Sequence, residues 1–558
     1  MLRFAPAATA ALVAGPILAG LAGVLLPAFG VLPALGGDAP SLDPWVRLLG
    51  QPGLARSMLL SLACGLATTA VSLAIVLAFL AAAAGTGWLS WARRVTGPLL
   101  AVPHAAVAVG VAFLIAPSGL LARALSPWAT GWRQPPDLLI VHDPLGLAMM
   151  AGLVLKEVPF LLLVSLAALP ALDPARRLAI ARSLGHRRAT AWLKVVAPGL
   201  YPLIRLPVYA VVAYASSTVD VALILGPTSP PTLAVAVLRW FSDPDLSLRF
   251  MAAAGAVAQL GVTLAALALW RFGEAVAGGL GRIWLAGPDR GIAERPALAV
   301  GIVAMSAVVL ALGLATTGLA LASVSWRWTF PDLLPDGFTV AVWGRTLPGI
   351  GAALAATLWI AVPATLLSLA AALAVLENEA RGGRAGPTWL LYLPMLVPQL
   401  PFLFGMAAGA ETARLAPGAG LVLLGHAVFV LPYVFLTLSE AYRRHDPRWI
   451  MLARTLGASR ARAFWVVRLP MLLAPCLAAA AVGLAVSVGQ YLPTLLLGAG
   501  RVETVTTAAV AMASGGDRRL VGAWVLAQAV VPVTGFAIAL LLPRLVWRGR
   551  RGLRDGGA

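Results

Sequence analysis

Six polar residues lie inside long apolar stretches of the sequence, where they could recognise a solute. They are Lys156, Glu157, Thr218, Asp220, Gln490 and Tyr491. Ionisable groups removed from water are costly, and they often mark a binding site or a pathway. Two interpretations stay open: the groups tie helices together by hydrogen bonds, or they line a pathway. In the second case Asp220 and Glu157 favour a cationic solute.

Lys156 and Glu157 are neighbours in the sequence, but they need not pair with each other. Successive residues on a helix point about 100° apart. We therefore expect each of the two side chains to meet a partner on another helix.

Chemistry that the sequence lacks narrows the function further. The phosphate-binding loop of ATPases needs a lysine in Gly-x-x-x-x-Gly-Lys-Ser/Thr, and neither of the two lysines, Lys156 and Lys194, has that setting. The five histidines are scattered without metal-ligand spacing, and Cys64 and Cys476 lie in apolar stretches. We expect no catalytic residue, metal or cofactor in this chain.

The composition indicates a membrane protein. Of 558 residues, 60% are hydrophobic and only 11% are charged, whereas soluble proteins carry about 25% charged residues. The surface must therefore face lipid over much of the chain. The net charge is +19, but the basic residues lie between apolar segments and form no basic arm, so we expect no nucleic-acid partner.

The apolar runs predict an all-α polytopic fold. A helix crosses the hydrocarbon layer of a bilayer in about 20 residues. Runs of that length predict twelve spans, at 8–30, 57–84, 98–116, 145–169, 203–225, 247–271, 297–322, 347–376, 388–408, 419–440, 471–497 and 522–545. The first run could also be a cleavable signal peptide, but it exceeds the usual apolar length of one, and we read it as a retained helix.

The distribution of arginine and lysine predicts the orientation. Basic residues gather in the loops that share a side with the N-terminus, and cytoplasmic loops carry such an excess. The topology therefore has both termini in the cytoplasm.

The two halves of the chain repeat each other. Ala-Arg-Ser-Leu-Gly at 181–185 recurs as Ala-Arg-Thr-Leu-Gly at 453–457, 272 positions later, and Pro198 recurs as Pro470. Six spans per half give two repeats of the same orientation, with a pathway between them. The predicted domains are 1–272 and 297–558, joined by a cytoplasmic linker at 273–296.

A polar segment follows the fourth span of each half. We call 173–198 and 446–470 the first and second repeated loops. Each begins with Asp-Pro, at Asp173 and Asp446, which suits a helix cap followed by proline. A short basic helix should run to Gly185 or Gly457, where glycine permits a bend, and a second short helix should end at Pro198 or Pro470.

The repeated loops resemble the EAA loop of permeases of binding-protein-dependent ABC importers with the MetI-like type I fold. That loop reads Glu-Ala-Ala, three residues, Gly, nine residues, Ile-x-Leu-Pro. Both copies keep the 13-residue spacing from Gly to Pro. The residues that match the motif positions are Ala179, Ala181, Gly185 and Pro198, and Met451, Ala453, Gly457, Leu469 and Pro470. The initial Glu is replaced by Ala179 and Met451.

The resemblance implies the partners and the location. Each loop would dock on one of two copies of an ABC ATPase subunit, which binds ATP and Mg²⁺, and a periplasmic binding protein would deliver the solute. The chain would lie in the inner membrane of a bacterium. Fused two-half permeases of this kind are similar to those of thiamine and ferric-iron importers, which makes thiamine the first expectation for the solute.

Two other functions remain as alternatives. An ion-coupled secondary transporter can also have two six-helix halves, but it does not require duplicated loops with this spacing. A membrane enzyme would need an acidic or histidine-rich cluster, which the sequence lacks. Dependence on an ion gradient instead of ATP would favour the first alternative.

Overall fold

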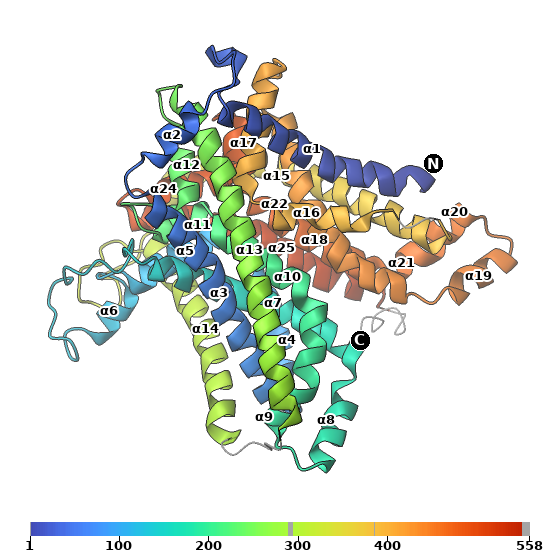
Figure 1. Cartoon of the computed structure of the whole chain (residues 1–558). Coiled ribbons are helices and arrows are strands. Elements are labelled where there is room, and N and C mark those ends of the chain that lie inside the picture. Colours follow the sequence, from blue (N-terminus) through green and yellow to red (C-terminus); the bar gives the residue numbers. More distant parts are fainter. Residues whose placement is uncertain (1, 288–293, 384–385, 549–558) are drawn as a thin grey trace.

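The computed structural model describes residues 2–287, 294–383 and 386–548. These residues form an all-helical bundle in which the only strand-like pairings are two isolated bridges, Leu32 with Gly37 and Ser325 with Phe338 (Figure 1). Helices satisfy their own backbone hydrogen bonds, which apolar surroundings require. The predicted fold class is therefore confirmed.

The first half contains thirteen helices among its described residues. Their bounds are α1 Ala5–Ala28, α2 Asp43–Leu49, α3 Leu54–Ala83, α4 Gly87–Ala101, α5 His104–Ile115, α6 Leu120–Leu125, α7 Leu147–Ala168, α8 Pro174–Ser183, α9 Arg188–Ala191, α10 Ala197–Ser217, α11 Asp220–Leu225, α12 Leu233–Phe241 and α13 Leu248–Ala286.

The second half has a similar order of helices, but its described residues form no helix at the places of α2 and α6. Its helices are α14 Glu294–Ser323, α15 Ala341–Ala380, α16 Leu393–Leu396, α17 Gln399–Thr412, α18 Ala419–Arg444, α19 Arg448–Thr455, α20 Arg460–Ala463, α21 Leu469–Met471, α22 Leu473–Val488, α23 Leu492–Gly498, α24 Val505–Ala513 and α25 Arg518–Val546.

Ten of the described helical segments are long and apolar enough to cross a membrane. Two pairs of helices, bent by 99° and 74°, raise the number to twelve if each pair is one span. All twelve predicted spans have a counterpart. The predicted span at 98–116 is interrupted at Val102 and Pro103, because proline has no N–H to continue the helix.

The first helix of each half packs on the opposite half. Helix α1 lies against α17, and α14 lies against α3 and α5. Glycines permit both crossings: a side chain at Gly20 would collide with the carbonyl oxygen of Phe402, and one at Gly301 with that of Ala78. The halves therefore exchange their first helices, which the repeat in the sequence did not reveal.

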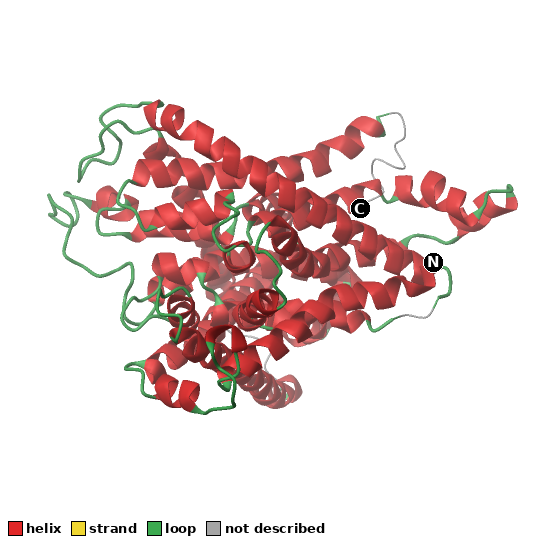
Figure 2. Cartoon of the chain, turned by 90° about the horizontal axis from the view of Figure 1, so that it is seen from above, coloured by secondary structure: helices red, strands yellow, loops and turns green. Residues whose placement is uncertain are grey.

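The repeated loops lie on one side of the molecule, at the tips of two separate groups of helices. In Figure 1, α8 and α9 form one tip, and α19 and α20 form the other. Figure 2 shows long loops gathered at the left side of the bundle and α-helical projections at the right. We call the side with α8 and α19 the loop side, because the repeated loops lie there, and the other the opposite side.

The prediction that a short helix ends at Pro198 is wrong. A continuous helix runs from Arg188 to Ser217, so Pro198 lies inside it. A π turn at Trp192–Val196 precedes the proline, which falls in the first turn of α10, where its missing N–H is tolerated. In the second copy the helix does end, at Met471. The predicted linker at 273–296 is helical as far as Ala286, and 288–293 lie outside the described residues.

Candidate functional site

An aspartate accepts a backbone N–H at the start of each repeated loop. The Asp173 carboxylate accepts the Arg176 N–H at 3.4 Å, and the Asp446 carboxylate accepts the Arg448 N–H at 2.9 Å. Such contacts satisfy N–H groups that the first helical turn leaves unpaired. Asp173 caps α8 with proline as its first residue, as predicted, whereas in the second copy Pro447 occupies the cap position and α19 begins at Arg448.

Both loops also turn at their glycine in the same way. Gly185 and Gly457 have φ angles of 85° and 86°, in the left-handed region. In each copy the next residue donates its N–H back to the alanine of the motif, from His186 to Ala181 and from Ala458 to Ala453. This arrangement closes the end of a helix and requires a residue that tolerates positive φ. A π turn then follows in each copy, which the sequence did not predict.

The two loops are anchored to the bundle by different contacts. In the first, the Arg188 guanidinium donates to the carbonyl of Ala82 at the end of α3, at 2.9 Å. In the second, Arg468 pairs with Glu377, which also binds Tyr442 and, at 2.6 Å, Arg381. Arg468 and Glu377 are both buried. The second anchor is therefore a buried ionic network, whereas the first is a contact to a backbone carbonyl.

Apolar side chains project from both repeated loops into solvent. Ile180 and Leu184 are exposed on α8, and Trp449, Met451 and Leu456 on or beside α19. Soluble surfaces rarely expose such a group together unless another protein covers it. Ala179 and Met451, which replace the motif glutamate, are also exposed. The arrangement can dock apolar grooves of a partner.

Lys156 and Glu157 contact the residues at the interruption of the third span. The Lys156 amine donates to the carbonyls of Leu100 and Val102, at 2.9 and 2.6 Å, which the interruption leaves without helical partners. Glu157 instead lies 3.3 Å from Nε2 of His104, the first residue of α5. The expectation that the two neighbours meet different partners is therefore confirmed.

A chain of polar contacts links the two predicted acidic residues. The His104 ring packs on the Tyr214 ring with 4.8 Å between centroids. The Tyr214 hydroxyl lies 3.4 Å from Asp220, and the Thr218 hydroxyl donates to Asp220 at 3.0 Å. We call these four residues, together with Glu157, the acidic cluster: Glu157, His104, Tyr214, Thr218 and Asp220. The structure thus brings Glu157 of the predicted fourth span together with Thr218 and Asp220 of the predicted fifth span.

The second half contributes tyrosines to the same region. Tyr491 lies within range of the Asp220 charge, and Tyr433 of α18 within range of the Glu157 charge. Gln490 is buried, and its backbone carbonyl accepts the Thr494 hydroxyl. The acidic cluster therefore lies where the halves meet, with carboxylates from the first half and aromatic hydroxyls from both.

The fifth span is interrupted at the same place in each half. Helix α10 ends at Ser217 and α22 at Val488, and short helices follow. Gln259 donates to the carbonyl of Ser216, while Gln528 binds Thr506, which donates to the carbonyl of Val488. Ser216 and Val488 are 272 positions apart and therefore equivalent. A glutamine of the sixth span binds the first of these carbonyls directly and the second through Thr506. Broken helices inside a bundle are characteristic of transport sites.

A buried histidine ties helices in the second half. The two ring nitrogens of His426 lie 2.8 Å from Ser487 and 2.9 Å from Thr494. A serine beside a histidine could suggest a nucleophile, but the ring is buried and both of its nitrogens are engaged. This contact fits the structural interpretation of the polar residues, not catalysis.

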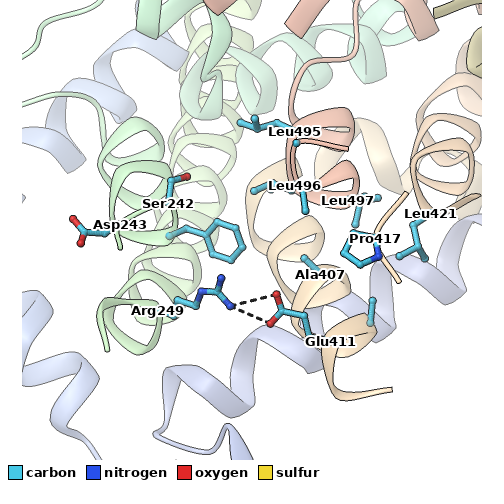
Figure 3. Close-up of a pocket in the computed structure, with 14 residues that line it drawn as sticks. Ser242, Asp243, Arg249, Ala407, Glu411, Pro417, Leu421, Leu495, Leu496 and Leu497 are labelled. Atoms are coloured by element: carbon cyan, nitrogen blue, oxygen red, sulfur yellow. Dashed lines mark hydrogen bonds and ion pairs between the residues drawn. The ribbon is translucent and has the colours of Figure 1, made fainter. Parts of the chain in front are cut away.

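A pocket of about 380 Å³ opens between the halves on the opposite side (Figure 3). Its walls come from the α12–α13 connection, α17 and α23. Arg249 of α13 and Glu411 of α17 point toward each other across it and form an ion pair at 3.1 Å. The two halves are therefore joined here, far from the repeated loops.

Sequence reasoning missed three residues of this region: His104, Tyr214 and Tyr433. A signal for the first was present, because His104 follows Pro103 inside an apolar run. Tyr214 and Tyr433 sit in apolar helices among other aromatic residues, and only packing shows that they face the carboxylates.

Comparison with known proteins gives one relative along nearly the whole chain. The chain is 33% identical over 519 residues to the inner membrane ABC transporter permease protein YnjC of Escherichia coli (strain K12), which covers 92% of this chain and 93% of the relative. No family model matches the chain.

Two further relatives match shorter segments. The putative 2-aminoethylphosphonate transport system permease protein PhnV of Salmonella typhimurium is 27% identical over 205 residues, 36% of this chain and 77% of the relative. The spermidine/putrescine transport system permease protein PotC of Haemophilus influenzae is 25% identical over 164 residues, 28% of this chain and 57% of the relative.

Proposed function

The chain belongs to the permeases of ABC importers, with both membrane halves fused in one inner-membrane protein, and we propose that it carries a small cationic solute through the acidic cluster. In this proposal two ATPase subunits dock on the repeated loops, and a periplasmic binding protein delivers the solute on the opposite side. The observation that supports it best is the duplication of one loop geometry, with the same bend at glycine and the same π turn.

The loop side would face the cytoplasm, together with both termini. Each half, 1–272 and 297–558, offers one repeated loop, so a symmetric pair of ATPase subunits has two equivalent places to bind. Exposed Ile180, Leu184, Trp449 and Leu456 supply apolar contacts, and neighbouring arginines add electrostatic attraction. Because the motif glutamate is absent, docking would depend more on apolar burial than on a carboxylate.

The acidic cluster would recognise the solute when the halves move. Glu157 and Asp220 are buried carboxylates, and Tyr433 and Tyr491 of the second half lie within range of their charges. Carboxylates with aromatic rings bind organic cations by charge attraction and cation–π contact. Closure of the ATPase dimer would bring the loops together and change which side of the cluster is open.

The relatives support a solute with a positively charged nitrogen. The names of two of them contain 2-aminoethylphosphonate and spermidine/putrescine. Each of these compounds carries an amine, but the first also carries an anionic phosphonate and is not a net cation. Nothing in these comparisons favours thiamine in particular, so thiamine is only one candidate among small organic cations.

Reconstitution with the cognate ATPase and binding protein tests the proposal. The three components should form a complex whose ATP hydrolysis drives uptake. The double variant Gly185→Pro/Gly457→Pro should lose the ATPase, because proline cannot adopt φ near 85°. Gly36→Pro/Gly131→Pro is the matched control, since both glycines have positive φ in loops away from the repeated loops. Uptake that needs an ion gradient and no ATPase would overturn the proposal.

A further inference from the structure

Three arginines from separate elements surround an open pocket beside the second repeated loop. Arg3 comes from the segment before α1, Arg381 follows α15, and Arg460 begins α20. The pocket has a volume of about 470 Å³, and Leu2, Asn378, Gly382 and Gly383 complete its wall. The segment at Leu2–Phe4 packs on α15, which keeps Arg3 at this place.

The charges around this pocket are not balanced by the described residues. Glu377 is the carboxylate that pairs with Arg381, and it also pairs with Arg468. No ion pair to Arg3 or Arg460 is found in the part of the chain that the structure describes. Guanidinium groups bind phosphate oxygens through paired hydrogen bonds, so the excess favours a phosphate-bearing anion.

Comparison of the two halves shows what such an anion would do. Arg188 is the counterpart of Arg460, 272 positions earlier, and it donates directly to the end of α3. At the second loop the Arg460 backbone carbonyl accepts a long contact of 3.5 Å from Arg381, and its side chain adjoins the pocket. A bound anion would connect α20 to the end of α15, as Arg188 connects α9 to α3.

We propose that this pocket binds the phosphate of an anionic ligand and thereby fixes the second repeated loop to α15. Two sources share this chemistry, the headgroup of an anionic phospholipid and free phosphate. The inference rests on the proposed function, because that function places the pocket at the cytoplasmic membrane surface, where anionic headgroups are abundant.

The test measures bound lipid and ATP hydrolysis in the intact complex. The complex is placed in discs of phosphatidylcholine, with or without phosphatidylglycerol, and retained lipid is detected by native mass spectrometry. We expect retained phosphatidylglycerol and faster ATP hydrolysis in wild type. The triple variant Arg3→Gln/Arg381→Gln/Arg460→Gln removes the three arginines of the pocket. Each arginine removed should weaken headgroup binding about fivefold.

A control variant removes equal charge elsewhere. Arg282→Gln/Arg544→Gln/Arg548→Gln changes three exposed arginines at the ends of α13 and α25 and should keep both lipid binding and stimulation. The single variant Arg3→Gln, at an exposed position before α1, serves if the triple variant does not fold.

The outcomes separate the alternatives. Equal retention of lipid by the triple variant and wild type would overturn the site. Stimulation by inorganic phosphate in pure phosphatidylcholine discs, lost in the triple variant, would support the pocket with free phosphate as its ligand. Failure of the complex to assemble in any lipid would count against the proposed function, whereas assembly with no effect of either anion would count against this pocket alone.

Discussion

Arg249 and Glu411 form an ion pair that joins the two halves on the side opposite the repeated loops. Arg249 lies near the start of α13 and Glu411 near the end of α17, and their side chains face each other across the pocket in Figure 3. The pair therefore contributes to the contact between the halves on this side.

Removing this pair should loosen the contact between the halves slightly. A partly exposed ion pair contributes about 0.2–1 kcal/mol, so Glu411→Gln should raise ATP hydrolysis without binding protein by about 1.4- to 5-fold. Glu440→Gln is the matched control, because Glu440 pairs with Arg444 on the same helix. An equal rise in both variants would show that the effect is not specific to the contact between halves.

Asp220→Asn should reduce uptake of a cationic solute without loss of assembly. Asparagine keeps an oxygen that accepts from Thr218 and Tyr214, so the local hydrogen bonds survive while the charge is removed. Loss of one buried charge contact corresponds to about 10- to 100-fold lower uptake. Asp245→Asn, on a surface loop, is the control. Normal uptake by Asp220→Asn would remove Asp220 from the pathway.

Lys156→Met should lower stability and leave solute preference unchanged. The variant leaves the carbonyls of Leu100 and Val102 without the hydrogen bonds from Lys156, which lowers the free energy of unfolding by about 1–3 kcal/mol. Thermal unfolding of the purified protein measures the loss, and competition between cationic and neutral solutes measures preference. A changed preference would instead place the Lys156 amine in the solute site.

The Glu377 network should matter more for stability than the ion pair between Arg205 and Glu274 in the first half. Arg468 and Glu377 are both buried, and breaking a buried pair costs about 3–5 kcal/mol. Arg205, which pairs with Glu274, is 39% exposed, so that pair contributes less. Glu377→Gln should therefore lower the melting temperature more than Glu274→Gln, and equal shifts would contradict this ranking. The double variant Glu377→Leu/Arg468→Met should recover part of the loss.

The crossing of α1 and α17 gives a prediction with a control on the same helix. Gly20→Val places a side chain against the backbone of Phe402, whereas Gly15 has open space around it. Overpacking of this kind costs about 1–3 kcal/mol or more. Gly20→Val should lower the melting temperature and increase proteolysis of α1, while Gly15→Val should do neither.

The sequence predicted features that depend on local pattern. Apolar runs predicted the spans, Asp-Pro predicted the cap of the first loop, and Gly predicted the bends of both loops, because caps and positive φ are set by neighbouring residues. The prediction for Pro198 failed because the helix continues through the proline there, although the same π turn precedes Pro470, where the helix ends. The Val-Pro pairs at 102–103 and 397–398 were available signals for the interruption of the third span in each half.

Features that depend on packing could not be predicted in this way. Helices that are apolar on every side have no periodic stripe to show which neighbour they contact, so the exchange of α1 and α14 was hidden. Gly20 and Gly301 marked the crossings, but many glycines of this chain meet open space. The contacts among Glu157, His104 and Asp220 likewise join segments far apart in the sequence.

The carboxylates of the acidic cluster have no equivalents in the second half. The residues 272 positions after Glu157 and Asp220 are Phe429 and Leu492. Two identical subunits would have to show every charge twice about their common axis. In this single polypeptide the two halves carry different residues at these positions. For the proposed function, a solute charged at one end and apolar at the other would therefore meet the carboxylates in one orientation only.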